Sequence, residues 1–421
     1  MKNPTFLIVC VVVAVSPLMR GSVHPWAQTV IQILVALGGI VLGVAAMRSK
    51  GPKKWSSREG DRFRQLFWYV AAPCAALGIW SAMMSPHPAR AVQGLVMLYT
   101  YLGFFFLVVM SVRTREDERA LVWVIVGTAG FLCVVGLLKR FDILVLPWWD
   151  YAAETGNAYR DSLTGVYVNR NHMAGFLEMA IPMMLILFIT RSRSLQARII
   201  MVLAAVFLVV CQALTLSRGG WAGTAGALAF MAAALLFKRG FAHKRLVGGL
   251  LAGAVMTGAI VLAVTPVVDR AVTLTGGGIE ENIAHRLNVW KGVRLMIADN
   301  PAAGTGPGTF EVAYPRYQQP GYPILVIYAH NDILQFASDT GVLFFPLMLW
   351  LLFLFFRAGF AKFRSPSRQT SGIALGCMAA VVAILIHSYS DGNLHIPANA
   401  LLFTALTALI SGANGVRPAL L

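Results

Sequence analysis

Apolar runs of about 20 residues recur along almost the whole chain, and they constrain the fold more than any other feature of the sequence. A helix needs about 20 apolar residues to cross the hydrocarbon core of a bilayer. Only 13% of the 421 residues are charged, which is roughly half of the share in a soluble domain. The runs do not alternate apolar and polar residues, as the strands of a membrane barrel do. The sequence therefore predicts an all-α polytopic membrane protein and excludes a soluble enzyme and a disordered chain.

About twelve transmembrane helices are predicted from these runs, within a single integral membrane domain over residues 1–421. Their expected ranges are 5–19, 26–47, 65–84, 92–112, 120–138, 173–190, 199–216, 220–237, 246–265, 333–356, 372–388 and 396–413. We interpret the first as a retained span, because no small-residue cleavage site ends it. Two connections are long, at 139–172 and 266–332, and both fall on the same side of the predicted topology.

The net charge of +17 is explained by topology. When the loops are assigned to alternating sides, one set holds 23 of the 35 Lys and Arg residues. The positive-inside rule makes this set cytoplasmic, where it also meets anionic membrane lipid. Both termini are then cytoplasmic and both long loops are periplasmic. The remaining bases are matched by acids, so no nucleic-acid partner is expected.

Three segments on the periplasmic side carry residues suited to an anion or to proton transfer. Arg218 lies in a turn between two spans, where its planar donors can match phosphate oxygens, or where it can simply reach toward the interface. Arg286 lies one turn before Trp290 in a helix expected over 280–300. His330 lies just before a span and can act as a base, or can serve as a capping residue.

The loop helix at 280–300 has an apolar stripe of Ile283, Leu287, Trp290 and Ile297 at near-helical spacing. A basic amphipathic helix of this kind can also rest on lipid. A Gly-rich turn at 304–308 follows it and could offer backbone amides to a phosphate group.

Two further segments are unusually polar for connections between spans. The turn at 387–395 contains Asp391, which could pair with an arginine, orient a histidine or stabilise the turn. Its two histidines and Asp391 suggest a metal only weakly. Asn171 and Asn331 are the two candidate residues with side-chain amides. Asn171 precedes a span and could serve as its N-cap.

The order of these segments resembles the O-antigen ligase and polymerase superfamily of bacterial envelope glycosyltransferases. The motifs that carry the resemblance are Asn-x-Asn-His-x-Ala-Gly at 169–175, Ser-Arg-Gly at 217–219, Arg286-x3-Trp290, Gly-Thr-Gly-Pro-Gly at 304–308, and His330 with Gly341 eleven residues later. The spacing from His330 to Gly341 and the chain length resemble the O-antigen ligase branch in particular.

The resemblance implies a fold and an activity. The expected fold is that of a C-type membrane glycosyltransferase. The expected reaction joins a glycan from undecaprenyl diphosphate to a sugar hydroxyl of the lipid A–core oligosaccharide, during lipopolysaccharide biosynthesis. It would take place at the periplasmic face of the bacterial inner membrane, with inversion at the anomeric carbon. No cofactor, metal ion or nucleotide sugar is expected.

The resemblance also implies roles for individual residues. His330 would be the general base, and Arg218 and Arg286 would bind the diphosphate. Asp391, Asn331, Trp290 and Asn171 would support them. An Arg-x3-Leu pattern of the ligases fits Arg270, whereas Arg286 has Trp290 at that spacing, and we favour Arg286 for the loop arginine.

Three other activities remain alternatives. A polymerase of O-antigen or exopolysaccharide would use the same donor with a second lipid-linked glycan as acceptor. A related ligase would glycosylate a protein. A polysaccharide transporter would use Arg218 and Glu178 to line a path, although no internal repeat of the transporter kind is present.

Overall fold

The computed structural model describes residues 3–48, 57–143, 161–191, 194–238, 278–320 and 325–412. All regular structure in these residues is helical, so the chain is a polytopic all-α membrane protein. Nine helices of the described part are long and apolar enough to cross a membrane. The predicted span at 246–265 lies outside the described residues.

The long helices follow one another with short connections, except across residues 141–169 and 238–343. They are α2 (Pro25–Arg48), α3 (Ser57–Leu66) continued through the π-turn η2 (Phe67–Ala71) into α4 (Ala72–Met83), α5 (Pro88–Ser111), α6 (Arg115–Arg140), α8 (Arg170–Arg191), α9 (Leu195–Leu214), α10 (Arg218–Phe237), α16 (Phe344–Phe363) and α17 (Arg368–Ser388). Two shorter apolar helices join the bundle, α1 (Pro4–Leu18) and α18 (Pro397–Ser411). The smaller elements are η1 (Arg20–Ser22), α13 (Gly278–Asp299), α14 (Phe310–Ala313), η4 (Tyr314–Tyr317), α15 (Asp332–Thr340) and η5 (Asn393–His395).

The prediction of one span over 333–356 is wrong. Residues 332–340 form the separate helix α15, which ends at Gly341 with a φ of +83°, and α16 begins only at Phe344. Glycine adopts this backbone conformation without a steric penalty. Hydropathy merges the two helices because α15 also contains apolar residues, but its buried face carries polar groups such as Asp332 and Gln335.

Local sequence explains where several helices begin. Thr114 and Asp117 form a reciprocal capping box at the start of α6, and three acidic residues occupy its first turn. Ser217 caps α10 by accepting a hydrogen bond from the backbone of Gly220. The start of α10 is therefore fixed directly before Arg218.

Helices α8 and α17 form the centre of the bundle, since most of their residues are buried. The surrounding helices expose large apolar side chains on their outer faces, among them Ile40, Trp68, Leu203 and Leu349. Such an apolar outer surface is stable in hydrocarbon rather than in water. The core and the outer faces are thus both apolar.

A second, smaller core lies under α13. Val289, Val293 and Met296 pack against α14, η4 and the segment before α15. The predicted stripe is wrong at Leu287, whose side chain is 48% exposed, whereas Trp290 and Ile297 do pack against this core. The fully buried positions of α13 are thus shifted by one residue from the predicted line, and they belong to the same core as Phe310 and Tyr314.

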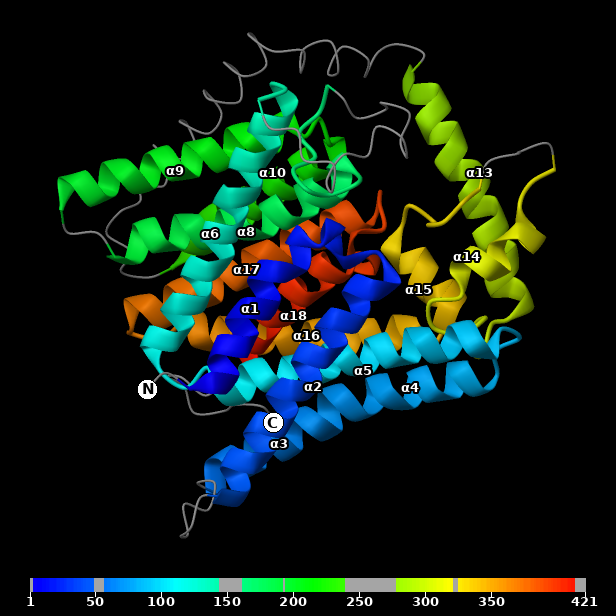
Figure 1. Cartoon of the computed structure of the whole chain (residues 1–421), viewed down its shortest axis with the longest axis horizontal. Helices are drawn as coiled ribbons and strands as arrows, with labels where there is room; N and C mark the ends of the chain where they lie inside the picture. Colours follow the sequence, from blue (N-terminus) through cyan, green and yellow to red (C-terminus); the bar gives the residue numbers. More distant parts are fainter. Residues whose placement is uncertain are drawn as a thin grey trace.

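Helices α13, α14 and α15 gather at one end of the bundle, on the right of Figure 1. Hydrogen bonds fasten them to the end of α4 and the start of α5, through Ser85 to Thr305 and through Arg90 to Glu311. Two predicted cytoplasmic loops also meet each other, because the guanidinium of Arg119 donates a hydrogen bond to the side-chain oxygen of Gln369 at 2.8 Å. Loops of the same predicted side are therefore grouped in space.

Candidate functional site

His330 lies in the turn that leads into α15. Its Nδ1 is 3.2 Å from Oδ1 of Asp391, which belongs to the connection between α17 and α18. The side chain is 28% exposed, so part of the ring remains open to the surroundings. The backbone φ of His330 is +49°, a conformation that non-glycine residues rarely adopt and that clusters at active sites.

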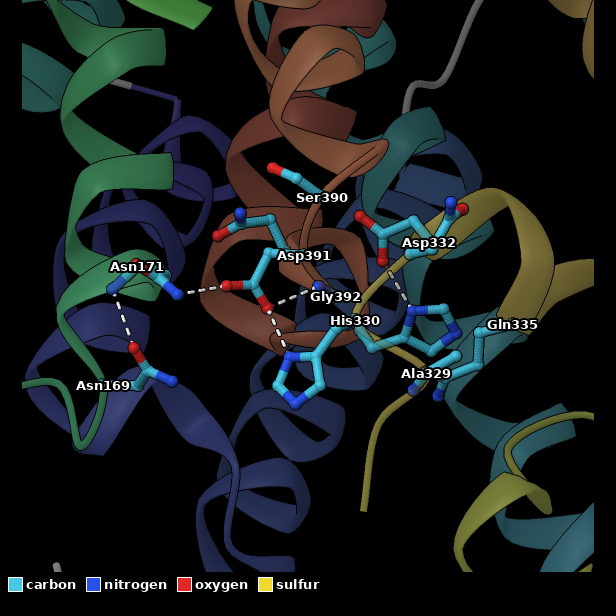
Figure 2. A network of polar contacts seen from close by, with 12 residues as sticks. Asn169, Asn171, Ala329, His330, Asp332, Gln335, Ser390, Asp391 and Gly392 are labelled. Atoms are coloured by element: carbon cyan, nitrogen blue, oxygen red, sulfur yellow. Dashed lines mark hydrogen bonds and ion pairs between the residues drawn. The ribbon is translucent and has the colours of Figure 1, made fainter. Parts of the chain in front are cut away.

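Asp391 is buried and fully engaged. Its carboxylate accepts hydrogen bonds from the backbone of Gly392 at 2.8 Å and from the side-chain amide of Asn171, as Figure 2 shows. Burial alone would raise the pKa of Asp391, but the hydrogen bond with His330 and the charges of nearby histidines lower it well below its usual range. Asp391 therefore stays ionised and can hold the Nδ1–H of His330.

Asn171 reaches Asp391 instead of capping its own helix. Helix α8 begins at Arg170, and the side chain of Asn169 accepts the hydrogen bond from the backbone of Asn171 at 2.8 Å. The N-cap interpretation of Asn171 is thus wrong. Its amide is left available because the residue two positions earlier takes the capping contact.

The segment 330–332 and the turn 388–395 are held together along their backbones. The Asp332 amide donates to the carbonyl of Asp391 at 3.2 Å, and Asn331 donates from its side chain to the carbonyl of Tyr389 at 3.0 Å. Asn331 also caps α15 by accepting from Leu334. Two segments about 60 residues apart in sequence therefore form one rigid unit.

A second Asp–His pair lies beside the first and is absent from the sequence prediction. Asp332 is buried and accepts from the hydroxyl of Ser388, the amide of Leu394 and Nδ1 of His395, the last at 2.6 Å. The pairing is crosswise, since each segment supplies one histidine and one aspartate. Only the tertiary structure could show this, because the partners are 63 residues apart.

Trp290 connects α13 to the residue that precedes His330. Its indole N–H donates to the carbonyl of Ala329 at 2.9 Å, and its ring meets Tyr389 edge to face. One turn earlier, the His285 ring lies 5.8 Å from the His330 ring between centroids. Burial, His330 and Arg286 lower the pKa of His285. The helix that carries Arg286 is therefore packed against His330.

Arg218 is the first residue of α10, and its neighbour Gly219 lies against the 387–391 turn. A Cβ at Gly219 would overlap His387 and approach Oγ of Ser390 to 2.7 Å. The structure thus brings the start of α10 to the same turn that carries Asp391. Arg270 lies outside the described residues.

The Gly-rich turn at 304–308 does not present an open cradle of amides. The amides of Thr305 and Gly306 donate to carbonyls of α15, and that of Gly308 donates to the Asp339 side chain at 3.0 Å. The suggestion of a phosphate site at these amides is therefore wrong. Gly304, Gly306 and Gly308 have positive φ angles, and Gly308 also lies close to the backbone of Gly94.

The polar side chains of 387–395 do not converge on one point. Among the residues that the structure describes, His387 pairs with Glu178, His395 pairs with Asp332, and Asp391 pairs with His330. The residues that the structure describes contain no group of three side chains placed to bind a metal ion.

An apolar cavity of about 840 Å³ lies beside the unit formed by segment 330–332 and the turn 388–395. Helices α4, α5, α16 and α18 line most of it, and Tyr328, Asp332 and His395 are among its polar lining residues. The lining positions on α18 run from Pro397 to Ser411, which corresponds to about 20 Å at 1.5 Å per residue. The cavity therefore has the length and character expected of a lipid-chain site.

The fold and these contacts define a multi-pass membrane protein with a histidine–carboxylate site at one end of its bundle. A family model described as O-antigen ligase matches residues 203–349, so this segment is similar to the O-antigen ligase family. The matched segment contains Arg218, Arg286, Trp290 and His330, whereas Asp391 and Asn171 lie outside it. The family resemblance seen in the order of the motifs is thereby confirmed. A search of curated proteins finds no match.

Proposed function

We propose that this protein is an O-antigen ligase that transfers a glycan from undecaprenyl diphosphate to a sugar hydroxyl of lipid A–core. The observation that carries the proposal is the His330–Asp391 pair, at one end of the bundle and beside the two segments that carry the candidate arginines. The reaction would occur at the periplasmic face of the inner membrane.

His330 is suited to be the general base. An ionised Asp391 holds a proton on Nδ1, so Nε2 of the neutral ring carries a lone pair. That nitrogen can accept the proton of an acceptor hydroxyl while the hydroxyl oxygen attacks the anomeric carbon. Asn171, Asn331 and Gly392 keep the carboxylate and its segment in place, and this fixes the direction of the ring.

Arg218 and Arg286 are the residues proposed to bind the diphosphate. The leaving group carries more negative charge as the glycosidic bond breaks, and fixed cations stabilise that charge. Arg218 also lies at the N-terminus of α10, where the helix dipole adds positive potential. Trp290, through its hydrogen bond to Ala329, would hold the helix of Arg286 near the base.

The cavity supports a lipid-linked donor. Its lining is mostly apolar, and it includes Asp332, two residues after His330. A polyprenyl chain in this cavity would bring its head group toward the base. Attack by the acceptor opposite the departing diphosphate would invert the anomeric centre in a single displacement.

Substitution of His330 tests the role of the base. His330→Ala should retain binding of the lipid-linked donor, while turnover falls by roughly 10²–10⁴-fold. His330→Gln should be equally inactive, because an amide keeps a hydrogen bond but cannot accept the proton. Near-normal turnover of the Gln variant would show that His330 only positions the acceptor.

The glycolipid profile of a deletion strain separates the ligase from the polymerase. A ligase predicts unmodified lipid A–core with long glycan retained on undecaprenyl diphosphate. Lipid A–core that bears a single repeat unit would instead identify a polymerase.

A further inference from the structure

A Glu–His pair is buried in the middle of the bundle, apart from the residues given roles above. Glu178 of α8 is 0% exposed and His387 of α17 is 1% exposed. Both carboxylate oxygens of Glu178 lie close to Nδ1 of His387, at 3.2 and 3.1 Å. Ionisable side chains inside a membrane protein are costly, and they are usually retained for a function.

The other ring nitrogen of His387 points to the start of α10. Nε2 lies 3.4 Å from Oγ of Ser217, whose oxygen accepts from the backbone of Gly220 at 3.3 Å. With Glu178 ionised and the imidazole neutral, Glu178 accepts from Nδ1–H and Nε2 accepts from the Ser217 hydroxyl. The serine oxygen also accepts from the backbone of Gly220. The chain of hydrogen bonds ends one residue before Arg218.

The first turns of α10 lie directly on this pair. A Cβ at Gly219 would overlap the His387 ring, and one at Gly223 would come within 2.6 Å of Oε2 of Glu178. Two glycines four residues apart therefore let the helix approach without a gap. The position of Arg218 along and around the helix axis is set by this contact.

The backbone of His387 holds the other half of the site. Its carbonyl accepts hydrogen bonds from the amides of Ser390 at 2.8 Å and Asp391 at 3.0 Å. One residue thus contacts the helix start that carries Arg218 with its ring, and the turn that carries Asp391 with its backbone. Since Asp391 orients His330, a shift of His387 would move the cation relative to the base.

We propose that His387 is a positioning residue that fixes Arg218 relative to the His330–Asp391 pair, through the contact of its ring with Ser217 at the start of α10. This inference rests on the proposed glycosyl transfer, because it assigns His387 to that site. Ser217 is 1% exposed and is held by Gly220, so it serves as the cap that receives the contact and not as a nucleophile.

Two substitutions of His387 separate the contacts of its ring. The side-chain amide of Gln reaches the position of Nε2 and keeps a hydrogen bond to Ser217. The shorter amide of Asn reaches only the position of Nδ1 and keeps the hydrogen bond to Glu178. His387→Asn should lower kcat/KM by roughly 10²-fold, as expected for a misplaced catalytic group. His387→Gln should retain most of the activity. The control His87→Asn, at the start of α5, should leave activity unchanged.

A double-mutant cycle with Arg218→Ala tests the mechanism. If His387 acts through Arg218, His387→Asn should cost less than about 3-fold in that background, because residues that act as one unit are not additive. Fully additive losses would overturn the proposal. So would a His387→Asn variant with near-normal kcat/KM, or a Gln variant that is less active than Asn.

Hydrogen exchange provides a readout that does not depend on transfer. The amides of 218–222 should exchange faster in His387→Asn than in the wild type, and at the wild-type rate in His387→Gln. If the wild-type protein transfers no glycan, the proposed function fails, while this exchange pattern still decides whether His387 holds the start of α10. Unchanged exchange in His387→Asn would overturn the inference whatever the activity.

Discussion

His330 shows how much of the site depends on single residues in unusual conformations. Its left-handed backbone turns the ring toward Asp391, and Trp290 fixes the preceding carbonyl. A histidine just before a hydrophobic helix could be recognised from sequence as a candidate base. Its carboxylate partner could not be chosen, since Asp391 had several interpretations and Asp332 is nearer in sequence.

Substitution of the two arginines should nearly abolish transfer. Arg218→Ala or Arg286→Ala removes a cation that would stabilise the departing diphosphate, and comparable losses cost about 2.7–4 kcal/mol. Lys should restore little activity, because a point charge cannot reproduce the planar fork of donors. Transfer rates with purified donor and acceptor measure the effect. Full activity of Arg218→Ala would contradict a role for that residue.

Chelation of divalent ions should leave transfer intact. The arginines would supply the positive charge that a metal ion would otherwise provide, and the resemblance to the ligase family implies no metal. Activity in purified membranes before and after EDTA tests this expectation. A loss that a divalent ion restores would overturn it.

At the level of elements, α15 and the Gly-rich turn at 304–308 connect the small core under α13 to the helix bundle. These two segments together are called the clasp. Ser81 donates from its side chain to the carbonyl of Asp339 at 2.7 Å, and the Gly306 amide donates to the same carbonyl at 2.9 Å. The Asp339 side chain accepts from Gly308, yet its other oxygen is buried without a partner among the described residues. The clasp therefore contains one buried ionisable group with an unsatisfied oxygen.

The stability of this clasp should depend on pH. Burial raises the pKa of Asp339 to about 7 in the folded protein, so the folded state favours the protonated form. Its contribution to stability is fully present below about pH 4 and is lost as the pH rises toward 7. Asp339→Asn, which stays neutral, should gain thermal stability relative to the wild type at pH 8 and little at pH 5. Melting temperatures in detergent measure the difference, and a difference that does not change with pH would contradict the assignment.

The whole molecule separates two chemical environments. The candidate site lies at the end where α8, α10 and α18 begin, together with α13–α15. The basic loops near Arg119 and Gln369 meet each other elsewhere. This grouping agrees with loops that alternate between two sides.

Labelling should place the candidate site in the periplasm and both termini in the cytoplasm, because the loop charges divide 23 to 12. In a background without the five native cysteines, a cysteine at the exposed Lys291 should react with a membrane-impermeant reagent in intact cells permeable only at the outer membrane. A cysteine at Arg113 is the matched control and should react only after the inner membrane is opened. The reverse pattern would overturn the orientation and the proposed site with it.

The sequence by itself determined the class of fold, the approximate spans and the family resemblance. These features depend on local hydropathy, on loop charge and on the order of short motifs, all of which can be read without knowing contacts. It also indicated His330, Arg218 and Arg286 as candidates, because titratable and cationic residues at span boundaries are conspicuous in an apolar chain.

Only the tertiary structure decided which residues meet. The pairs His330–Asp391, Asp332–His395 and Glu178–His387 join residues 61, 63 and 209 positions apart. No local pattern encodes such distances, since they follow from how α8, α17 and α15 pack. The break at Gly341 and the shifted face of α13 have the same origin. Packing against neighbouring helices decides burial there, and hydropathy along one segment cannot report it.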